Sequence, residues 1–384
     1  MKIIIAPDSF KGSNTTIAVA NTIEKGIRKV FPDAEIVKIP IADGGEGTVD
    51  ALVLGAGGKF KEITVTGPLG EKVQAKYGIL DNGAAVIEMA AASGLPLVPE
   101  NKKNPMVTTT YGTGELIKAA LDDGCRKIVI GIGGSATNDG GLGMAQALGV
   151  SFKDKDGKEL GYGGGELEKL AVIDVSNIDP RIKDTEIIIA CDVSNPLCGE
   201  KGASAVYGPQ KGATPEMVKQ LDANLRHFAR IIKEQLGQDI IDVPGTGAAG
   251  GLGAGLIVFC GAQLKSGIET VLDVVNIDRH LPTTDLVITG EGKIDGQSIY
   301  GKVPVGVGQR VKKYNLPVLA IVGDIGDGAS AVYDYGVDGI MSTVNKAMPL
   351  SEAMGRSSEL LEDAAERVMR IIKIGMVMRR SDIL

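Results

Sequence analysis

The sequence contains no tryptophan and few other aromatic residues, and this shortage limits its partners. Phenylalanine and tyrosine together make up 4% of the 384 residues, so the chain offers little surface on which nucleobases could stack. The formal net charge is −7, whereas proteins that bind nucleic acid need a basic surface to neutralise phosphates. We therefore expect no nucleic-acid partner, although a local cationic site can still bind a small anion.

Cysteine and histidine are also scarce, which argues against a zinc or iron–sulfur centre. There are two histidines, and the four cysteines form no CxxC pair. Zinc and iron–sulfur sites need closely spaced cysteine or histidine ligands. We expect reduced, partly buried thiols, as in a cytoplasmic protein.

Long apolar runs are missing as well. The apolar run near the N-terminus has about four residues, too few for the core of a signal peptide. Residues 245–264 form an uncharged stretch of membrane-spanning length, but seven of these twenty residues are glycine. We interpret this stretch as a glycine-rich loop that continues into a buried helix, and we expect no membrane partner.

Glycine is abundant, with 54 residues in the chain, and the ends of the chain repeat one pattern. An apolar strand is followed by a glycine-rich turn and an amphipathic helix, which is typical of parallel βαβ units. The expected strands of this kind are residues 2–6, 35–41 and 339–344, together with a strand and loop at 285–293 and a strand and turn at 317–324. The expected helices are residues 14–30, with Ser13 or Asn14 as N-cap, residues 300–313 and residues 351–373.

The middle of the chain shows a different pattern. Residues 61–90 contain three short apolar segments with no room for helices between them, which predicts an antiparallel meander. Helix–strand units then resume, and Thr214-Pro215 is typical of a helix start. We predict an α/β protein in which a mixed α/β domain, residues 61–274, is inserted into a parallel-sheet domain formed by residues 1–60 and 275–384.

Seven glycine-rich loops lie mostly at the carboxyl ends of these strands, where open parallel sheets bind ligands. They are residues 7–13, 42–48, 131–141, 191–199, 208–214, 244–253 and 289–298. Glycine lets main-chain N–H groups approach an anion closely, and a helix N-terminus adds partial positive charge.

The same loops carry charged side chains of both signs. The lysines are Lys11, Lys211 and Lys293, and the acids are Asp8, Asp43, Glu46, Asp192, Glu291 and Asp295. Lysine suits phosphate, and paired carboxylates suit Mg²⁺. Phosphoryl transfer needs a cradle, cations and a carboxylate that accepts a proton, so the pattern favours this chemistry.

Two other functions stay open on the residues alone. Residues 245–250, GTGAAG, fit a dinucleotide-binding motif and leave a dinucleotide-dependent oxidoreductase as one alternative. A non-catalytic module that binds a small carboxylate is the other. Residues 296–303 have the spacing of a P-loop, but Val303 stands where serine or threonine must contact magnesium, so we reject that motif.

Eight motifs in order resemble the bacterial glycerate kinase family of the first type. They are APDSFKGS, PIADGGEGT, GTGEL, GIGGSATNDGG, DVSNPLCGEKGA, YGPQKGA, PGTGAAGGLG and TGEGKIDGQS, between residue 3 and about residue 325. The resemblance implies ATP- and Mg²⁺-dependent phosphorylation of D-glycerate, giving 2-phosphoglycerate more often than 3-phosphoglycerate. It also implies a flavodoxin-like (Rossmann-like) domain with an inserted α/β domain and the active site in the cleft between them. A kinase for a related small hydroxy acid is an alternative.

Within this reading, each motif residue receives a role. Asp192 follows the expected strand 186–190 and would accept the hydroxyl proton, while Lys11 and Lys293, with Asp8 in the same catalytic group, would surround the transferred phosphate. The predicted ATP-binding residues are Gly133, Gly134, Ser135, Asn138 and Lys211. The glycerate carboxylate is the alternative ligand of the first four, and ATP phosphate is preferred. The predicted glycerate-binding residues are Ser9, Asp43, Glu46 and Asp295, and Asp43 and Glu46 are also the candidate Mg²⁺ ligands. A homodimer is left open.

Overall fold

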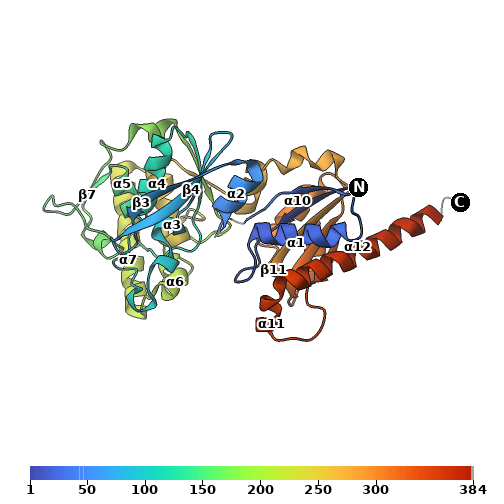
Figure 1. The fold of residues 1–384 in the computed structure, drawn as a ribbon. Helices are drawn as coiled ribbons and strands as arrows, with labels where there is room; N and C mark the ends of the chain where they lie inside the picture. The colour runs from blue at the N-terminus through green and yellow to red at the C-terminus, as the bar shows by residue number, and fades with distance from the viewer. Residues whose placement is uncertain (43, 46, 382–384) are drawn as a thin grey trace. The chain divides into compact units, whose positions relative to one another are not determined.

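The structure is a computed structural model that describes residues 1–381 apart from residues 43 and 46. The chain divides into two compact units. Unit 1 comprises Met1–Asp43, Asp50–Ala56 and Ile268–Leu384, and unit 2 comprises Gly44–Val49 and Gly57–Gly267. Both units combine helices with parallel strands (Figure 1), so the prediction of a mixed α/β protein with parallel sheets is confirmed.

Unit 1 contains a five-stranded sheet in which all neighbouring strands are parallel. Its order is β13-β12-β11-β1-β2. The strands are β1 (Lys2–Pro7), β2 (Glu35–Lys38), β11 (Leu286–Ile294), β12 (Val318–Ile325) and β13 (Gly339–Ser342). Since the strands are parallel, the loops that follow them meet at one edge of the sheet.

Helices cover both faces of this sheet. Helices α1 (Thr16–Arg28) and α12 (Ser357–Ser381) lie side by side on one face (Figure 1), where Ile5 belongs to the same buried cluster as both helices. Helix α10 (Val303–Lys312) lies on the other face, where Val322 is buried in a second cluster. Successive side chains of a strand point to opposite faces, so buried strands supply both clusters.

All three helices predicted in unit 1 have other boundaries than expected. Helix α1 begins at Thr16, because Thr15 is the N-cap and its hydroxyl accepts a hydrogen bond from the Ala18 N–H, instead of Ser13 or Asn14 acting as cap. Helix α10 begins at Val303, three residues later than expected, with Pro304 in its first turn, a position that proline favours.

The helix expected at residues 351–373 is two helices. Helix α11 (Leu350–Gly355) ends at Arg356, whose φ of −106° and ψ of 14° depart from helical values. Helix α12 then runs to Ser381, well past the expected end. The apolar positions of its last turns therefore belong to the helix, which continues past the predicted end at residue 373.

Unit 2 contains a six-stranded mixed sheet of order β10-β9-β6-β5-β4-β3. Strands β3, β4 and β5 pair antiparallel, which confirms the meander, and the pairs β5–β6, β6–β9 and β9–β10 are parallel. The strands are β3 (Gly58–Thr66), β4 (Lys72–Leu80), β5 (Ala85–Glu88), β6 (Lys127–Gly131), β9 (Glu186–Ala190) and β10 (Gln263–Lys265), with a separate pair β7 (Ser151–Lys153) and β8 (Val172–Asp174).

Helices of very different length connect these strands. They are α3 (Ala90–Ser93), α4 (Tyr111–Asp122), α5 (Leu142–Ala147), α6 (Ala203–Tyr207), α7 (Pro215–Leu236) and α8 (Leu252–Cys260), while α2 (Thr48–Ala56) and α9 (Gly267–Val274) lie where the chain changes unit. The Thr214 hydroxyl accepts the Met217 N–H at 3.3 Å, and Pro215 is the first residue of α7, as predicted.

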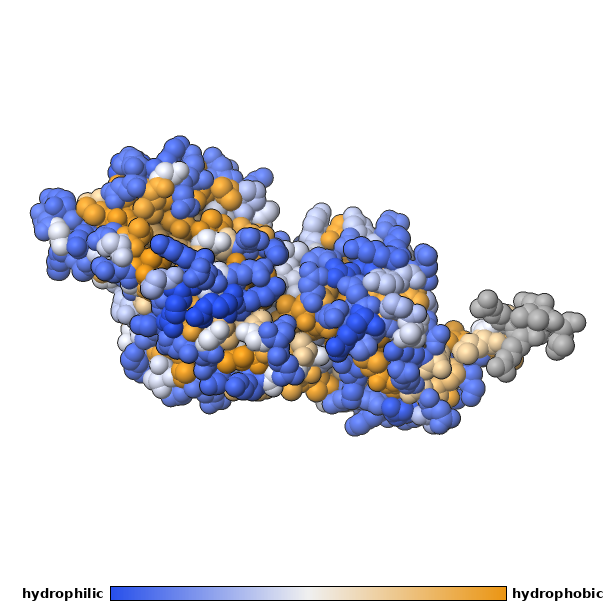
Figure 2. Space-filling model, turned by 90° about the horizontal axis from the view of Figure 1, so that it is seen from above, coloured by the Kyte–Doolittle hydropathy of each residue, from blue (hydrophilic) through white to orange (hydrophobic). Residues whose placement is uncertain are grey.

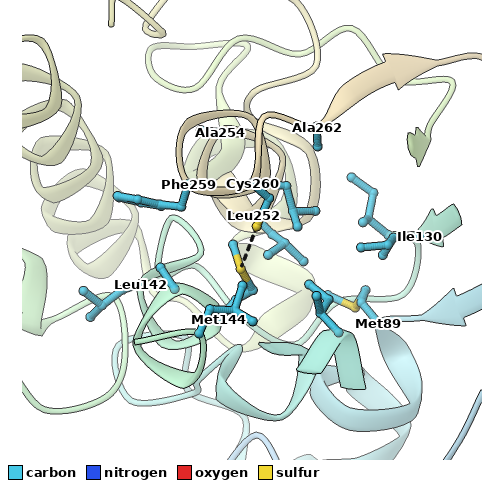
Figure 3. Packing of buried hydrophobic residues seen from close by; sticks show 14 of the residues in the cluster. Met89, Ile130, Leu142, Met144, Leu252, Ala254, Phe259, Cys260 and Ala262 are labelled. Atoms are coloured by element: carbon cyan, nitrogen blue, oxygen red, sulfur yellow. Dashed lines mark hydrogen bonds between the residues drawn. The ribbon is translucent and has the colours of Figure 1, made fainter. Parts of the chain in front are cut away.

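The uncharged stretch 245–264 contributes α8, which lies inside unit 2 as predicted. Figure 3 shows α8 with Cys260 pointing toward Met144 of α5, and the Cys260 thiol donates a hydrogen bond to the Met144 sulfur at 3.8 Å. Burial raises the pKa of the Cys260 thiol to about 12, so it stays protonated and unreactive. All four cysteines are free thiols, which agrees with the sequence-based expectation.

Among the described residues, no helix has the length and apolar character needed to cross a lipid bilayer.

We predict that Gly26 holds α1 and α12 together through close packing. A Cβ atom on Gly26 would lie 2.5 Å from the Glu362 carbonyl oxygen and 2.6 Å from Ala365 Cβ. Glycine to alanine usually stabilises a helix, but overpacking costs about 1–3 kcal/mol, so Gly26→Ala should lower the free energy of unfolding. Urea unfolding measures this change. Gly355→Ala is the control, because no atom lies within 4 Å of its added Cβ; equal stability of the two variants would contradict the prediction.

Candidate functional site

Main-chain segments pack directly on one another around the glycine-rich loops of unit 2. A Cβ atom on Gly131, at the end of β6, would lie 2.4 Å from the Gly44 carbonyl oxygen. At Gly250, where φ is +71°, it would lie 2.0 Å from the Thr137 carbonyl oxygen. No other residue type fits at these distances, so glycine lets the end of β6 lie against Gly44 and lets the loop at 244–253 lie against the loop at 131–141.

Unit 1 has a cavity of about 900 Å³ at the carboxyl edge of its sheet. Its walls come from the segments that follow β1, β11, β12 and β13 and from α11. The charged and hydroxyl side chains that line it include Asp8, Ser9, Lys11, Glu291, Lys293, Lys302, Asp324 and Thr343. The structure thus brings four predicted residues, Asp8, Ser9, Lys11 and Lys293, into one cavity.

Two buried carboxylates lie on neighbouring strands of this cavity. Asp8 is 8% exposed and Glu291 is 6% exposed. The Asp8 N–H donates to the Gly290 carbonyl at 2.8 Å, which fixes the end of β1 beside β11. The Ser298 hydroxyl donates to Glu291 Oε1 at 3.1 Å, and Lys302 Nζ lies 3.6 Å from Glu291 Oε2.

The Glu291 carboxyl can gain or lose a proton near neutral pH. Burial raises its pKa to about 7, and the nearby Asp8 carboxylate adds to the rise, while Lys302 opposes it. A buried acid with a shifted pKa in a cleft is a common mark of a functional site.

Cations surround these acids. Lys11, Lys293 and Lys302 line the cavity, and Lys293 Nζ lies 3.9 Å from Asp295 Oδ2. Asp295 itself is placed beside Lys293 and turns back to accept the Gln297 N–H at 3.0 Å. The cavity can therefore hold an anion between three lysines with acids at its base.

The side chains that line this cavity include enough carboxylates to bind Mg²⁺. Magnesium is usually held by one or two carboxylates together with substrate phosphates and water, and Asp8 and Glu291 can supply the protein oxygens. In the described part of the chain, no group of three histidine, cysteine, aspartate or glutamate side chains could hold a metal by itself. The predicted ligands Asp43 and Glu46 lie outside the described residues.

The predicted ATP loop of unit 2 connects β6 to α5 and is largely buried. Ser135 is 6% exposed, and Asn138 is fully buried with its amide donating to the Ser204 hydroxyl at 3.0 Å. The neighbouring Asp139 carboxylate accepts four hydrogen bonds, from the N–H and hydroxyl of Thr110 and from the N–H groups of Gly141 and Gly143. Asp139, which the sequence did not single out, thus fixes the end of this loop at the start of α5.

Lys211 lies beneath this loop, at 1% exposure. Its ammonium donates to the Thr137 carbonyl at 2.6 Å. Burial lowers the pKa of Lys211 to about 7, with Asp139 opposing the shift. Direct contact of Lys211 with a nucleotide stays a prediction; in the structure this side chain supports the loop from inside.

Asp192 lies just past the end of β9, as predicted, separated from the strand by Cys191, and hydrogen bonds orient its carboxylate. Asp192 Oδ1 accepts the Ser266 hydroxyl at 2.8 Å and the Gly267 N–H at 3.0 Å. These donors hold the carboxylate at a defined position on the exposed end of the strand.

Sequence reasoning gave no role to Glu291 or Lys302, although both stand in or beside a glycine-rich loop. The available signal was the strand-end position of Glu291, in the segment TGEGKIDG. Its burial depends on the pairing of β1 with β11, which joins residues more than 280 positions apart.

We predict a pH-dependent stability that originates at Lys211. Its folded-state pKa lies below the usual 10.5, so the charged form destabilises the fold. This penalty is fully present below about pH 7 and disappears as the pH rises toward 10.5. Relative to Lys211→Met, the native protein should gain roughly 2–3 kcal/mol of stability between pH 6 and pH 9.

Urea unfolding at the two pH values measures this difference, and Lys219→Met, an exposed lysine on α7, is the control. A stability difference between native protein and Lys211→Met that is the same at both pH values would refute the assignment.

Comparison with known proteins identifies relatives along almost the whole chain. The family model described as "Glycerate kinase family" matches residues 3–373. The chain is 53% identical to glycerate 2-kinase of Escherichia coli K12 over 377 residues, covering 98% of this chain and 99% of the relative. It is 54% identical to glycerate kinase of Halalkalibacterium halodurans over 367 residues, covering 95% and 97% of the two chains.

A solved structure agrees with these relatives. A crystal structure from Salmonella typhimurium LT2, assigned as glycerate kinase 2, superimposes with a TM-score of 0.89 at 50% identity and covers 98% of this chain and 99% of its own. The family resemblance seen in the eight motifs is confirmed, and with it the prediction of a kinase. The chain belongs to the glycerate kinase family.

Proposed function

We propose that the chain transfers the γ-phosphate of ATP to the C2 hydroxyl of D-glycerate. The observation that supports this most is the unit 1 cavity, where buried Asp8 and Glu291 lie among three lysines in a chain of the glycerate kinase family. Preference for the C2 hydroxyl comes from the Escherichia coli relative, which is named a glycerate 2-kinase. With ATP as co-substrate, we also propose a cytoplasmic location.

The fold supports a more detailed description. Numbered by chain order within unit 1, its strands run 2-1-3-4-5 across the sheet, which is the flavodoxin order. Residues 57–267 of unit 2 lie in the sequence between two segments of unit 1, Asp50–Ala56 and Ile268–Leu384. We propose that unit 1 is a flavodoxin-like domain and that unit 2 is inserted into it.

In the proposed mechanism, Lys11, Lys293 and Lys302 neutralise charge on the transferred phosphoryl group. Asp8 and Glu291 would hold Mg²⁺, and this ion, when bound, would neutralise charge on the phosphate oxygens. Ser9 lines the same cavity and Asp295 lies beside Lys293, which supports the proposal that both contact the hydroxyls of glycerate. Asp43 and Glu46 retain their proposed substrate and metal roles from the sequence.

The remaining groups come from unit 2. The Asp192 carboxylate accepts the proton of the attacking hydroxyl, while Ser266 and Gly267 hold it in position. The N–H groups of Gly133 and Gly134 and the hydroxyl of Ser135 would contact ATP phosphates. Asn138 and Lys211 would act on ATP through this loop, since Asn138 is buried within it and Lys211 is buried beneath it.

Replacement of Asp192 tests the proposed base. Asp192→Asn keeps the shape of the side chain but cannot accept the proton, so kcat should fall by about 10²–10⁴-fold while KM for ATP changes little. Asp184→Asn, an exposed acid just before the other end of β9, is the matched control and should keep its activity. Near-normal turnover of folded Asp192→Asn would remove this residue as the base.

Titration of Glu291 gives a second test, independent of turnover. A bound cation favours the carboxylate, so binding of Mg²⁺ with a non-hydrolysable ATP analogue at pH 6.5 should release a proton from Glu291. Calorimetry in two buffers of different ionisation enthalpy counts that proton, and Glu291→Gln should abolish its release. If the binding enthalpy of the native protein is the same in both buffers, no proton is released, and Glu291 is not a ligand of Mg²⁺.

A coupled assay of ADP release separates the proposal from its alternatives. D-glycerate should support turnover far better than related small hydroxy acids. A dinucleotide-dependent oxidoreductase would instead bind NADH or NADPH and release no ADP. A binding module would bind glycerate without any turnover.

A further inference from the structure

The unit 1 cavity has apolar walls that the proposed chemistry does not use. The acids and lysines that would act on phosphate belong to β11 or follow β1, apart from Lys302. The apolar side chains that line the cavity come mostly from other elements, namely the end of β12, the segment after β13 and α11. They are Phe10, Ile325, Val344, Met348, Leu350 and Met354.

Several of these apolar side chains are exposed. Leu350 is 74% exposed, Ile325 46% and Met354 38%. Apolar residues are also exposed along the last turns of α12 (Figure 2), but those residues lie outside this cavity. The α11 side chains differ because they share one cavity with acids and lysines, which favours a ligand that has both an apolar and an anionic part.

Contacts with the loop after β1 hold α11 at the cavity. A Cβ atom on Gly12 would lie 2.9 Å from Met354 Cε, so the methionine side chain lies directly on this loop. At the start of α12, the Ser357 hydroxyl accepts hydrogen bonds from the Ser13 hydroxyl at 3.3 Å and from the Asn14 amide at 3.1 Å. The apolar wall is therefore built into the cavity beside the loop that carries charged residues.

Thr343, which follows β13, adds a polar group to this wall. It is 5% exposed, and its N–H donates to the Val322 carbonyl at 2.8 Å. Thr343 lines the cavity, yet its hydroxyl makes no hydrogen bond to any residue in the described part of the chain. Buried hydroxyl groups nearly always have a partner, so this one points to a ligand that supplies it.

Asp324, near the end of β12, is an exposed acid of the same cavity. Its carboxylate forms no ion pair or hydrogen bond with the residues that the structure describes. In nucleotide-binding α/β folds, an acid beyond a parallel strand accepts hydrogen bonds from ribose hydroxyls. Asp324 has the position and the chemistry for this contact.

The size of the cavity also fits a nucleotide. Its volume of about 900 Å³ lies within the range of about 300–1,000 Å³ that is usual for sites enclosing drug-sized ligands. A three-carbon acid with one phosphate would leave most of this space to water. A purine nucleotide combines a flat apolar ring, ring nitrogens that accept hydrogen bonds, and an anionic triphosphate.

We propose that the adenine ring of ATP packs against Met348, Leu350 and Met354. The Thr343 hydroxyl donates to a ring nitrogen, Asp324 accepts the ribose hydroxyls, and the triphosphate extends toward the lysines of the same cavity. This inference rests on the proposed use of ATP and assigns its nucleoside to unit 1. The phosphate contacts proposed for the loop of unit 2 are a separate prediction.

Photolabelling locates the base directly. Trypsin cuts after Lys313, Lys346 and Arg356, so it releases the proposed site as two peptides, residues 314–346 and 347–356. An ATP derivative with an azide on the adenine ring should label one or both of them under ultraviolet light, and excess ATP should suppress the labelling. Labelling confined to peptides outside residues 314–356, or labelling that ATP does not suppress, overturns the inference.

A substitution in α11 separates binding of the base from binding of the phosphates. Leu350→Ser removes apolar surface, so it should weaken binding of a non-hydrolysable ATP analogue about tenfold and leave the dissociation constant of tripolyphosphate unchanged. In turnover, the loss should appear in KM for ATP. Leu54→Ser makes the same change on a 52% exposed leucine of α2, outside the cavity, and should bind the analogue like the native chain.

The outcomes of this binding experiment distinguish the inference from the proposed reaction. If Leu350→Ser and the native chain bind the analogue equally well, the inference is overturned and the proposed reaction stands. If the native chain binds neither the analogue nor ATP, the proposed use of ATP is overturned as well.

The ribose contact has its own test. The native chain should bind the analogue more tightly than the dideoxyribose form of the analogue, and Asp324→Ala should bind both forms equally. A preference for the full ribose that Asp324→Ala retains overturns this contact.

Discussion

Direct packing of main chain on main chain is the constraint on which both units depend. Glycine at Gly131 and Gly250 in unit 2 lets loops from distant parts of the chain meet without side chains between them. Unit 1 repeats this at the edge of its cavity, where a Cβ on Gly323 would lie 2.4 Å from the Gly292 carbonyl oxygen. The high glycine content is therefore a packing requirement, and it also brings charged loop residues close together.

That closeness places ionisable groups where water cannot solvate them. Glu291 in unit 1 and Lys211 in unit 2 carry opposite charge, yet burial moves the pKa of each to about 7. Each charged form destabilises its unit, so stability alone does not account for these residues. This cost is consistent with the proposed binding of charged phosphate and carboxylate groups.

The sequence predicted the features that depend on local pattern. Parallel strands, the meander and the Thr214-Pro215 helix start all follow from residue periodicity and capping, and the structure contains them. The predictions failed for helix boundaries that depend on tertiary packing. One example is the break at Arg356, before α12. Asp8 and Lys293 could be placed at strand ends, but the burial of Glu291 and Lys211 could not be predicted, because it depends on contacts between segments far apart in the chain.

Phosphorus NMR of the product formed from ATP and D-glycerate tests the central claim most directly. Transfer to the C2 hydroxyl gives a phosphomonoester whose phosphorus couples to one proton, so its resonance should be a doublet. A triplet would show transfer to the CH₂ hydroxyl at C3 and contradict the proposed product. The absence of any new phosphomonoester resonance, with ATP and Mg²⁺ in excess, would contradict the proposed reaction itself.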